Sequence, residues 1–319
     1  MDAVPTATQC GMTSTPILRV SDLPSGVTAS QLRGRRFRRL SRDVYLPADA
    51  EDTLLTCCQA LAEVLPGGSA FCLSTGARLL RLPVFDGERV LLHVAVPREA
   101  TLTRRQQVTA HGWWLPPEHV VHVEGIPVVS AARTFMDLAP ALRLEQLVAF
   151  GDAALRCGHA TQPDIDSIVG TGTRRRGILR ARQAAKLLDA RAESPPESIV
   201  RVWLHLSGLP AAEPNVVITD LGGRFVARVD LCIREYRIAV EYEGRYHRDA
   251  AQYADDLDRR NRLQEAGLLV VHLEQHMLRS PQTVVQPVAA ALRTRGWTGY
   301  PDFSFAHEPA GRRRRPDSR

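Results

Sequence analysis

The chain has 319 residues, 44% of them hydrophobic, and carries a formal net charge of +6 with a pI near 9.3. This length suits two domains, and the apolar content supplies a real core, which excludes a wholly disordered protein. No apolar run approaches the ~20 residues that span a bilayer, and no basic segment leads into an apolar one as in a signal peptide. We therefore expect a cytoplasmic protein without a membrane partner, and its mildly basic charge is compatible with nucleic acid.

The six cysteines form no CxxC pair. Their spacing predicts neither a disulfide framework nor a zinc knuckle, so we interpret them as small buried hydrophobic residues. Free thiols of this kind are typical of a reducing compartment.

Residues 1–16 are polar and small and contain proline, which predicts a loose leader. In the stretch SGVTASQLRGRRFRRLSRDVYLPAD that follows from Ser25, Thr28 can cap a short helix over residues 29–32, and VYLP has the composition of a strand. A short helix, a basic turn and a β-ribbon are typical of an abbreviated winged helix.

Arginine dominates this stretch, and no acid follows until Asp43. Phe37 and Leu40 are interleaved with the basic residues. The basic residues are Arg33, Arg35, Arg36, Arg38, Arg39 and Arg42. Such clustering favours a surface that faces DNA phosphates over the alternative, a solvated basic loop.

The sequence of residues 17–193 predicts one α+β domain, and the abbreviated winged helix is its first part. Helical patterns at 53–65 and 70–82 precede the expected strands VLLHVAVP, HVVHVEG and IPVVS, and two further helices follow at 131–138 and 144–157. A glycine-rich turn then opens a basic helix, but it is no P-loop because no Lys-Ser/Thr pair follows the glycines. We place a domain boundary before Ser194.

Residues 194–297 predict a second domain in the order helix, strand, strand, helix, strand, helix, and residues 298–319 predict a basic disordered tail. The first helix opens at SPPE, where Ser194 is the expected N-cap and Glu197 falls at the third helical position. This capping box gives Glu197 a structural role, and a role in a metal site stays open.

The segment GRFVARVDLCIREYRIAVEYEG predicts a β-hairpin. If its turn centres on Glu235 and Tyr236, Asp230 lies directly across from Glu241, with Cβ atoms about 5 Å apart. Glu243 is two residues further along and shares the face of Glu241. Three carboxylates in one patch require protonation, arginine partners or a divalent cation.

Oxygen ligands select a hard ion, so a cation held by Asp230 and Glu241 would be Mg²⁺ or Mn²⁺. It could bind a phosphodiester oxygen and lower the pKa of a bound water, with His247 as the acid, the base or a ligand of the phosphate. The alternative is a purely structural site in which arginines pair with these acids. The candidate arginines are Arg228, Arg245 and Arg259.

Several of these features together resemble the nuclease-fold domain of the very-short-patch-repair (Vsr-like) endonucleases, within the wider PD-(D/E)XK superfamily. They are Glu197 at a helix start, RVD ending at Asp230, the VEYEG run, His247, the DxxR motif at 256–259 and AGLLVVHL. The resemblance covers about residues 194–295. It implies an α/β restriction-endonuclease-like domain with a mixed central sheet flanked by helices.

The resemblance also implies metal ligands at Asp230 and Glu241 and an accessory acid at Glu197. Glu243 stands where the superfamily has its lysine. Either His247 or Arg259 replaces that lysine, or the domain is not catalytic. Arg259 is expected to face the acidic patch or a DNA phosphate.

The first half is similar to AbiEi-type antitoxin and regulator proteins of actinobacterial type. The matching stretches are VTASQLRGRRFRRLSRDVYLPAD, FCLSTGARLLRLP and IPVVSAARTFMDLA, within about residues 25–168. This resemblance implies a winged-helix start that binds DNA, an α+β domain behind it, and a toxin protein as a candidate partner.

Two hypotheses about function follow. The first is a DNA-binding protein whose Vsr-like domain hydrolyses DNA phosphodiesters with Mg²⁺ or Mn²⁺, in repair or defence. The alternative is a non-catalytic DNA-binding regulator of the type IV antitoxin class that uses the nuclease fold as a platform. Metal-dependent cleavage that is lost in Asp230→Ala distinguishes them.

Overall fold

A computed structural model describes residues 17–23, 27–87, 91–100, 105, 107–172, 175–220, 222–243 and 250–307, with the side chains of 250–257 excepted. The contacts within the chain divide it into two units. Unit 1 comprises residues 1–75 and 89–129, and unit 2 comprises residues 76–88 and 130–319. In the described part of the chain, no helix is long and apolar enough to cross a membrane.

Unit 1 begins with a three-stranded antiparallel sheet in the order β1-β3-β2. Its elements are β1 (Leu18–Arg19), η1 (Gln31–Arg33), β2 (Phe37–Ser41) and β3 (Val44–Pro47), followed by α1 (Leu54–Ala62). Instead of the helix expected over residues 29–32, the chain forms a single 3-10 turn. The Thr28 amide donates to Gln31 Oε1 at 2.7 Å and the Gln31 amide donates to Thr28 Oγ1 at 3.3 Å, which fixes the turn before Gly34 ends it.

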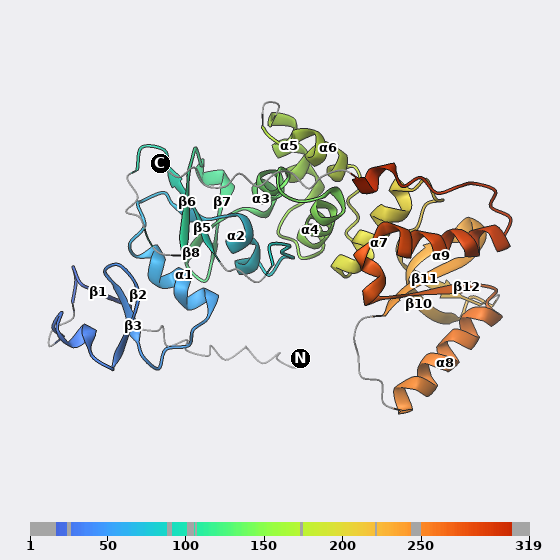
Figure 1. Cartoon of the computed structure of the whole chain (residues 1–319), viewed down its shortest axis with the longest axis horizontal. Helices are drawn as coiled ribbons and strands as arrows, with labels where there is room; N and C mark the ends of the chain where they lie inside the picture. Colours follow the sequence, from blue (N-terminus) through green and yellow to red (C-terminus); the bar gives the residue numbers. More distant parts are fainter. Residues whose placement is uncertain are drawn as a thin grey trace, which may run out of the picture. The chain divides into compact units, whose positions relative to one another are not determined.

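A five-stranded mixed sheet in the order β6-β5-β4-β8-β7 forms the rest of unit 1 (Figure 1). Its strands are β4 (Ala70–Phe71), β5 (Leu92–Pro97), β6 (Val108–Trp113), β7 (Val120–Val123) and β8 (Ile126–Val129), with η2 (Pro117–His119) before β7. The three expected strands are present as β5, β7 and β8. The helix expected over residues 70–82 starts later, as α2 (Leu73–Leu79), because its first residues pair as β4.

Unit 2 begins with helices that lead into the second sheet. They are α3 (Ala131–Leu138), α4 (Leu144–Arg156), α5 (Gln162–Thr171), α6 (Ile178–Ala185) and α7 (Pro195–Leu206). Helices α3 and α4 lie where the sequence predicts them, and Gly158 follows α4 with a φ of +70°, which favours glycine. Asp152 of α4 is buried and lies 2.8 Å from the guanidinium of Arg201 on α7. The boundary expected before Ser194 therefore falls within unit 2.

The second sheet has four strands in the order β12-β11-β10-β9. The strands are β9 (Glu213–Thr219), β10 (Phe225–Ile233), β11 (Ile238–Glu243) and β12 (Leu269–Glu274), with α8 (Ala250–Glu265) before β12, and η4 (Gln275–Arg279) and α9 (Pro281–Thr294) after it. β11 and β12 are parallel, whereas the other neighbours are antiparallel. The sheet is thus mixed, and β9 is a strand beyond the two expected before α8.

Helices cover both faces of this sheet (Figure 1). α7 and α9 pack on one face through Trp203 and Val288, against Leu231 and Val240. On the other face, Leu263 of α8 belongs to a second apolar cluster with strand residues of β10, β11 and β12. The chain is therefore a mixed α+β protein.

The expectation of a disordered tail from residue 298 is wrong for its first ten residues. Residues 304–307 form η5 (Ser304–His307), and Phe303 and Phe305 pack against the α7/α9 cluster. The Asp302 amide also donates to the Ser207 carbonyl at 3.0 Å. Aromatic burial therefore fixes this segment to the domain, whereas residues 308–319, like the leader at 1–16, lie outside the described residues.

Candidate functional site

The β10–β11 hairpin has the register that the sequence predicts. Its turn is η3 (Arg234–Tyr236), closed by Arg237 in the left-handed region at a φ of +52°. Leu231 is paired with Val240, and the pairing continues regularly to the turn. One step beyond, the acids Asp230 and Glu241 meet at the end of the paired region.

A backbone hydrogen bond fixes Asp230 at this position. The amide of Tyr242 donates to Asp230 Oδ2 at 2.8 Å. Burial raises the pKa of Asp230, while this amide and then the Arg259 guanidinium act to lower it. The Asp230 carboxylate is therefore partly buried beside β11.

Glu241 is the most buried acid of the group, with a side chain only 9% exposed. Arg259 of α8 covers it: Nη2 lies 2.7 Å from Oε1 and Nη1 donates to Oε2 at 3.1 Å. Burial raises the pKa of Glu241 to about 6, Arg259 opposes that rise, and Asp230 and Glu243 add to it. The carboxylates thus repel one another, and one guanidinium offsets part of the repulsion.

Of the other two candidate arginines, Arg228 pairs with a different acid, although its charge also acts to lower the pKa of Asp230. Arg245 falls outside the described residues. The guanidinium of Arg228 pairs with Glu193 at 2.8 Å. Its backbone carbonyl instead accepts from Arg259 Nη2 at 2.7 Å. Arg259 is therefore held at two points, by the Glu241 carboxylate and by the β10 backbone.

Glu243 contacts a histidine that is not among the predicted site residues. β11 and β12 pair Glu241 with His272 in parallel register, and His272 Nδ1 lies 3.1 Å from Glu243 Oε1. The signal in the sequence was a lone polar residue within the apolar run LLVVHL. The candidate His247 lies outside the described residues.

Glu197 has the structural role expected of it. Ser194 Oγ accepts from the Glu197 amide at 3.4 Å, so Ser194 is the N-cap of α7. In return, Glu197 Oε1 accepts from Ser194 Oγ at 2.7 Å, and Oε2 accepts from the Glu193 amide at 2.8 Å and from Asn215 Nδ2 at 2.9 Å. The returning bond reaches Glu193, one residue before the position in a standard capping box. Both oxygens are therefore engaged.

The acids fit a divalent cation as a two-carboxylate site. Mg²⁺ is commonly held by one or two carboxylates plus waters and substrate phosphates, and Asp230 and Glu241 supply that donor set. Within the described ranges, no group of three or more His, Cys, Asp or Glu side chains is arranged to hold a metal ion. A cation here would therefore share Glu241 with Arg259.

The basic segment of unit 1 divides into two orientations. Arg33, Arg35 and Arg36 are exposed at the end of η1 and in the turn before β2. On β2, side chains alternate: Arg39 is exposed, whereas Arg38 is only 28% exposed and lies 3.1 Å from Asp52. The outward face of the ribbon is therefore basic, and Arg38 does not belong to it.

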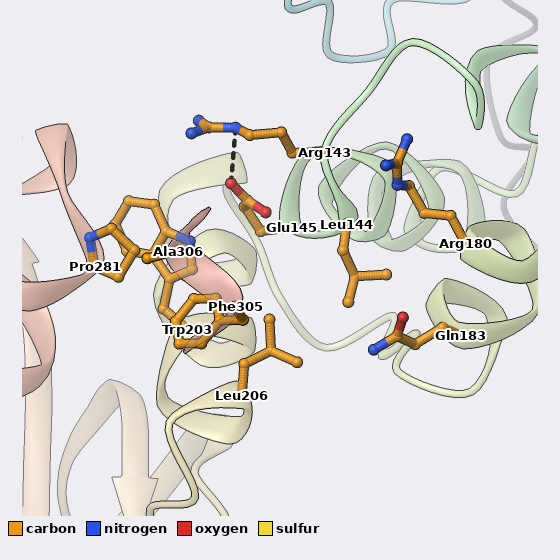
Figure 2. A pocket seen from close by; sticks show the side chains of 10 residues that line it. All are labelled: Arg143, Leu144, Glu145, Arg180, Gln183, Trp203, Leu206, Pro281, Phe305 and Ala306. Carbon is orange, nitrogen blue, oxygen red and sulfur yellow. Dashed lines mark ion pairs between the residues drawn. The ribbon is translucent and has the colours of Figure 1, made fainter. Parts of the chain in front are cut away.

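A small cavity in unit 2 contains none of the predicted site residues (Figure 2). It measures about 90 Å³, and its lining comprises Arg143, Leu144, Glu145, Arg180, Gln183, Trp203, Leu206, Pro281, Phe305 and Ala306. Figure 2 shows an ion pair at its edge, where Arg143 Nε lies 3.0 Å from Glu145 Oε1. The cavity is therefore separate from the acids of the β10–β11 hairpin.

The fold and site thus define a mixed α+β protein with a cluster of acids at the edge of a strand pair. No family model matches the sequence. Two relatives from Mycobacterium tuberculosis, uncharacterized protein MT2308 (strain CDC 1551 / Oshkosh) and uncharacterized protein Rv2248 (strain ATCC 25618 / H37Rv), are each 32% identical over 231 residues. The match covers 70% of this chain and 81% of each relative, so the chain belongs to the family of these mycobacterial proteins.

Proposed function

We propose that this chain is a DNA-binding protein whose residues 194–297 form a Vsr-like endonuclease domain of the PD-(D/E)XK type, with restriction-endonuclease-like topology. The observation that carries the proposal is the hairpin register, which brings Asp230 beside Glu241 on a mixed sheet with helices on both faces. The DxxR motif of the resemblance adds support because its arginine, Arg259, contacts Glu241. We place the protein in the cytoplasm, where its DNA substrate lies.

In this proposal, Asp230 and Glu241 hold Mg²⁺ or Mn²⁺. The bound ion supplies Lewis acidity toward a phosphodiester oxygen and lowers the pKa of a bound water. The protein's own residues orient the ligands: the Tyr242 amide directs Asp230, and Arg259 directs Glu241. Glu243 and His272 form a pair next to the ligands, where the superfamily has its lysine.

Unit 1 contributes a DNA-binding surface in this proposal, as a shortened winged helix of the AbiEi type. Its outward residues are Arg33, Arg35, Arg36 and Arg39. Arginines without an acidic neighbour bind phosphates and release counterions, which makes binding salt-dependent and independent of sequence. Phe37 and Tyr45 are half-buried on the same ribbon and add aromatic surface.

Cleavage of plasmid, nicked and mismatched DNA with Mg²⁺ or Mn²⁺ tests this function. Wild type is compared with Asp230→Ala and Glu241→Ala. We expect wild type to cut at least one of these substrates and both variants to lose that activity. Equal activity in all three proteins, or none in wild type on any substrate, would overturn the proposal.

A second function is favoured by one specific observation, the two-point ion pair between Arg259 and Glu241. Such a pair can serve as a structural substitute for a metal. The protein would then be a non-catalytic regulator of the antitoxin class, with a toxin protein as its candidate partner. This function predicts DNA binding that is salt-sensitive but unchanged by divalent cations or by EDTA.

A further inference from the structure

The contact between Arg259 and Glu241 uses both oxygens of the carboxylate. Nη1 donates to Oε2 at 3.1 Å, and Nη2 lies 2.7 Å from Oε1 and donates to the Arg228 carbonyl at 2.7 Å. The Glu241 side chain is 9% exposed and that of Arg259 is 37% exposed. The guanidinium therefore lies between a buried carboxylate and solvent.

The positive charge of Arg259 lies beside both oxygens of Glu241, although within the described residues Oε1 accepts no hydrogen bond. A guanidinium keeps its charge at any pH at which a protein is folded. Here it donates one hydrogen bond, to Oε2, and its Nη2 adds a close charge contact with Oε1. A divalent ion on Glu241 needs at least one of the two oxygens that Arg259 contacts. The two cations therefore compete, and each weakens the apparent binding of the other.

We propose that Arg259 is a positioning residue that acts as a displaceable internal cation. In the metal-free protein it compensates Glu241 and holds it in place, and a divalent cation binds only as Arg259 gives up part of its contact. This inference rests on the proposed function, since it assumes that Glu241 is a metal ligand.

The partial exposure of Arg259 makes displacement feasible without unfolding α8. Only its side chain has to rotate, and water can then hydrate the guanidinium. This displacement lowers the apparent affinity for the metal. The apparent dissociation constant rises by the reciprocal of the fraction of protein in which Arg259 has moved away from Glu241.

Calorimetric titration of the full-length protein with Mn²⁺ tests the inference without any measurement of cleavage. Arg259→Gln removes the competing charge, and we expect Mn²⁺ to bind at least about fivefold more tightly than to wild type, the lower range of typical coupling. Arg262→Gln is the matched control. Arg262 lies on the same helix and is exposed, and its Nε lies 3.5 Å from the Asp258 carbonyl rather than on an acid. The Mn²⁺ affinity of Arg262→Gln should differ from that of wild type by less than about twofold, because solvent and salt screen an exposed charge that does not contact the acids.

A second variant covers the case in which Arg259→Gln does not fold, since it leaves a buried carboxylate unpaired. Arg259→Lys keeps the charge but cannot span both oxygens and the Arg228 carbonyl. We expect its Mn²⁺ affinity to lie between those of wild type and Arg259→Gln. Circular dichroism establishes which variants are folded.

The outcomes separate this inference from the proposed function. Tighter binding in the Arg259 variants that is abolished by an added Asp230→Asn supports the inference. If wild type binds Mn²⁺ and the folded Arg259 variants bind it equally or more weakly, the inference is overturned and the metal site stands. If no folded variant binds Mn²⁺, the metal site and the inference both fall.

Discussion

Asp230 and Glu241 meet where the β10–β11 hairpin ends its regular pairing, and the amide of the next residue, Tyr242, donates to Asp230 Oδ2 at 2.8 Å. The Asp230 carboxylate thus accepts a structural hydrogen bond and is also a proposed metal ligand. Substitutions at this position separate the two roles, because asparagine keeps an oxygen acceptor and alanine does not.

We expect Asp230→Ala to lower the free energy of unfolding by about 1–3 kcal/mol, since it leaves the Tyr242 amide without its acceptor. Asp230→Asn should cost less, because its carbonyl can accept the same bond and burial disfavours a charge here. Urea unfolding followed by circular dichroism gives both values. An asparagine variant less stable than the alanine variant would contradict this assignment.

Arg38 and Arg39 provide a matched pair for DNA binding. Arg39 is exposed on the ribbon, whereas Arg38 pairs with Asp52. Arg39→Gln should weaken binding to duplex DNA and reduce the salt slope by about one, as expected for the loss of one phosphate contact. Arg38→Gln should leave the slope unchanged. Fluorescence anisotropy across a salt series measures both variants. Equal losses of DNA affinity in the two would contradict the assignment of DNA binding to the outward face of the ribbon.

Stability in unit 1 should fall in mild acid because of His111. Its ring lies against His93, with 3.1 Å between Nε2 and Nδ1 of His93, and burial followed by the nearby His93 lowers its pKa from 6.5 to about 4. The unfolded chain therefore takes up the proton first, so stability is intact above pH 6.5 and is lost as the pH falls toward 4. The loss is about 2–3 kcal/mol after allowance for solvent screening.

Urea unfolding at a series of pH values measures this loss. His111→Gln should flatten the profile between pH 6.5 and 4, whereas His122→Gln, an exposed histidine on the same sheet, should leave it unchanged. Parallel profiles for wild type and His111→Gln would show that another group titrates.

Thiol reactivity should follow burial. Cys157 is exposed, whereas Cys58 is fully buried and burial, followed by the neighbouring Cys57, raises its pKa to about 12. The thiolate is the reactive form, so iodoacetamide should modify Cys157 in the native protein and Cys58 only after unfolding. Mass spectrometry of timed samples resolves the two sites, and early labelling of Cys58 would mean that α1 opens readily.

The sequence predicted the elements in which local signals agree. The β10–β11 register followed from the position of the turn alone, and the α7 start followed from Ser194 and the prolines. β9 was missed although its buried residues alternate, because Pro214 and Asn215 disfavour a strand. β6 was missed because its residues are half-exposed and include polar ones.

The parts of the site that the sequence left open or missed are those that depend on contacts distant in sequence. The sequence named Arg259 as one of three candidate partners of these acids, but it could not select it, because its contact with Glu241 requires α8 to lie across the sheet. The position of His272 beside Glu243 depends on the parallel pairing of β11 with β12, for which the connection through α8 must be known.

Mn²⁺-dependent cleavage of DNA by wild type, Asp230→Asn and Glu235→Gln tests the central claim most directly. Glu235 is an exposed acid in the turn of the same hairpin, so its substitution controls for loss of one negative charge. We predict cleavage by wild type and Glu235→Gln, and none by Asp230→Asn at equal folding and DNA binding. Cleavage by Asp230→Asn at the wild-type rate, or no cleavage by wild type, would contradict the assignment of this site.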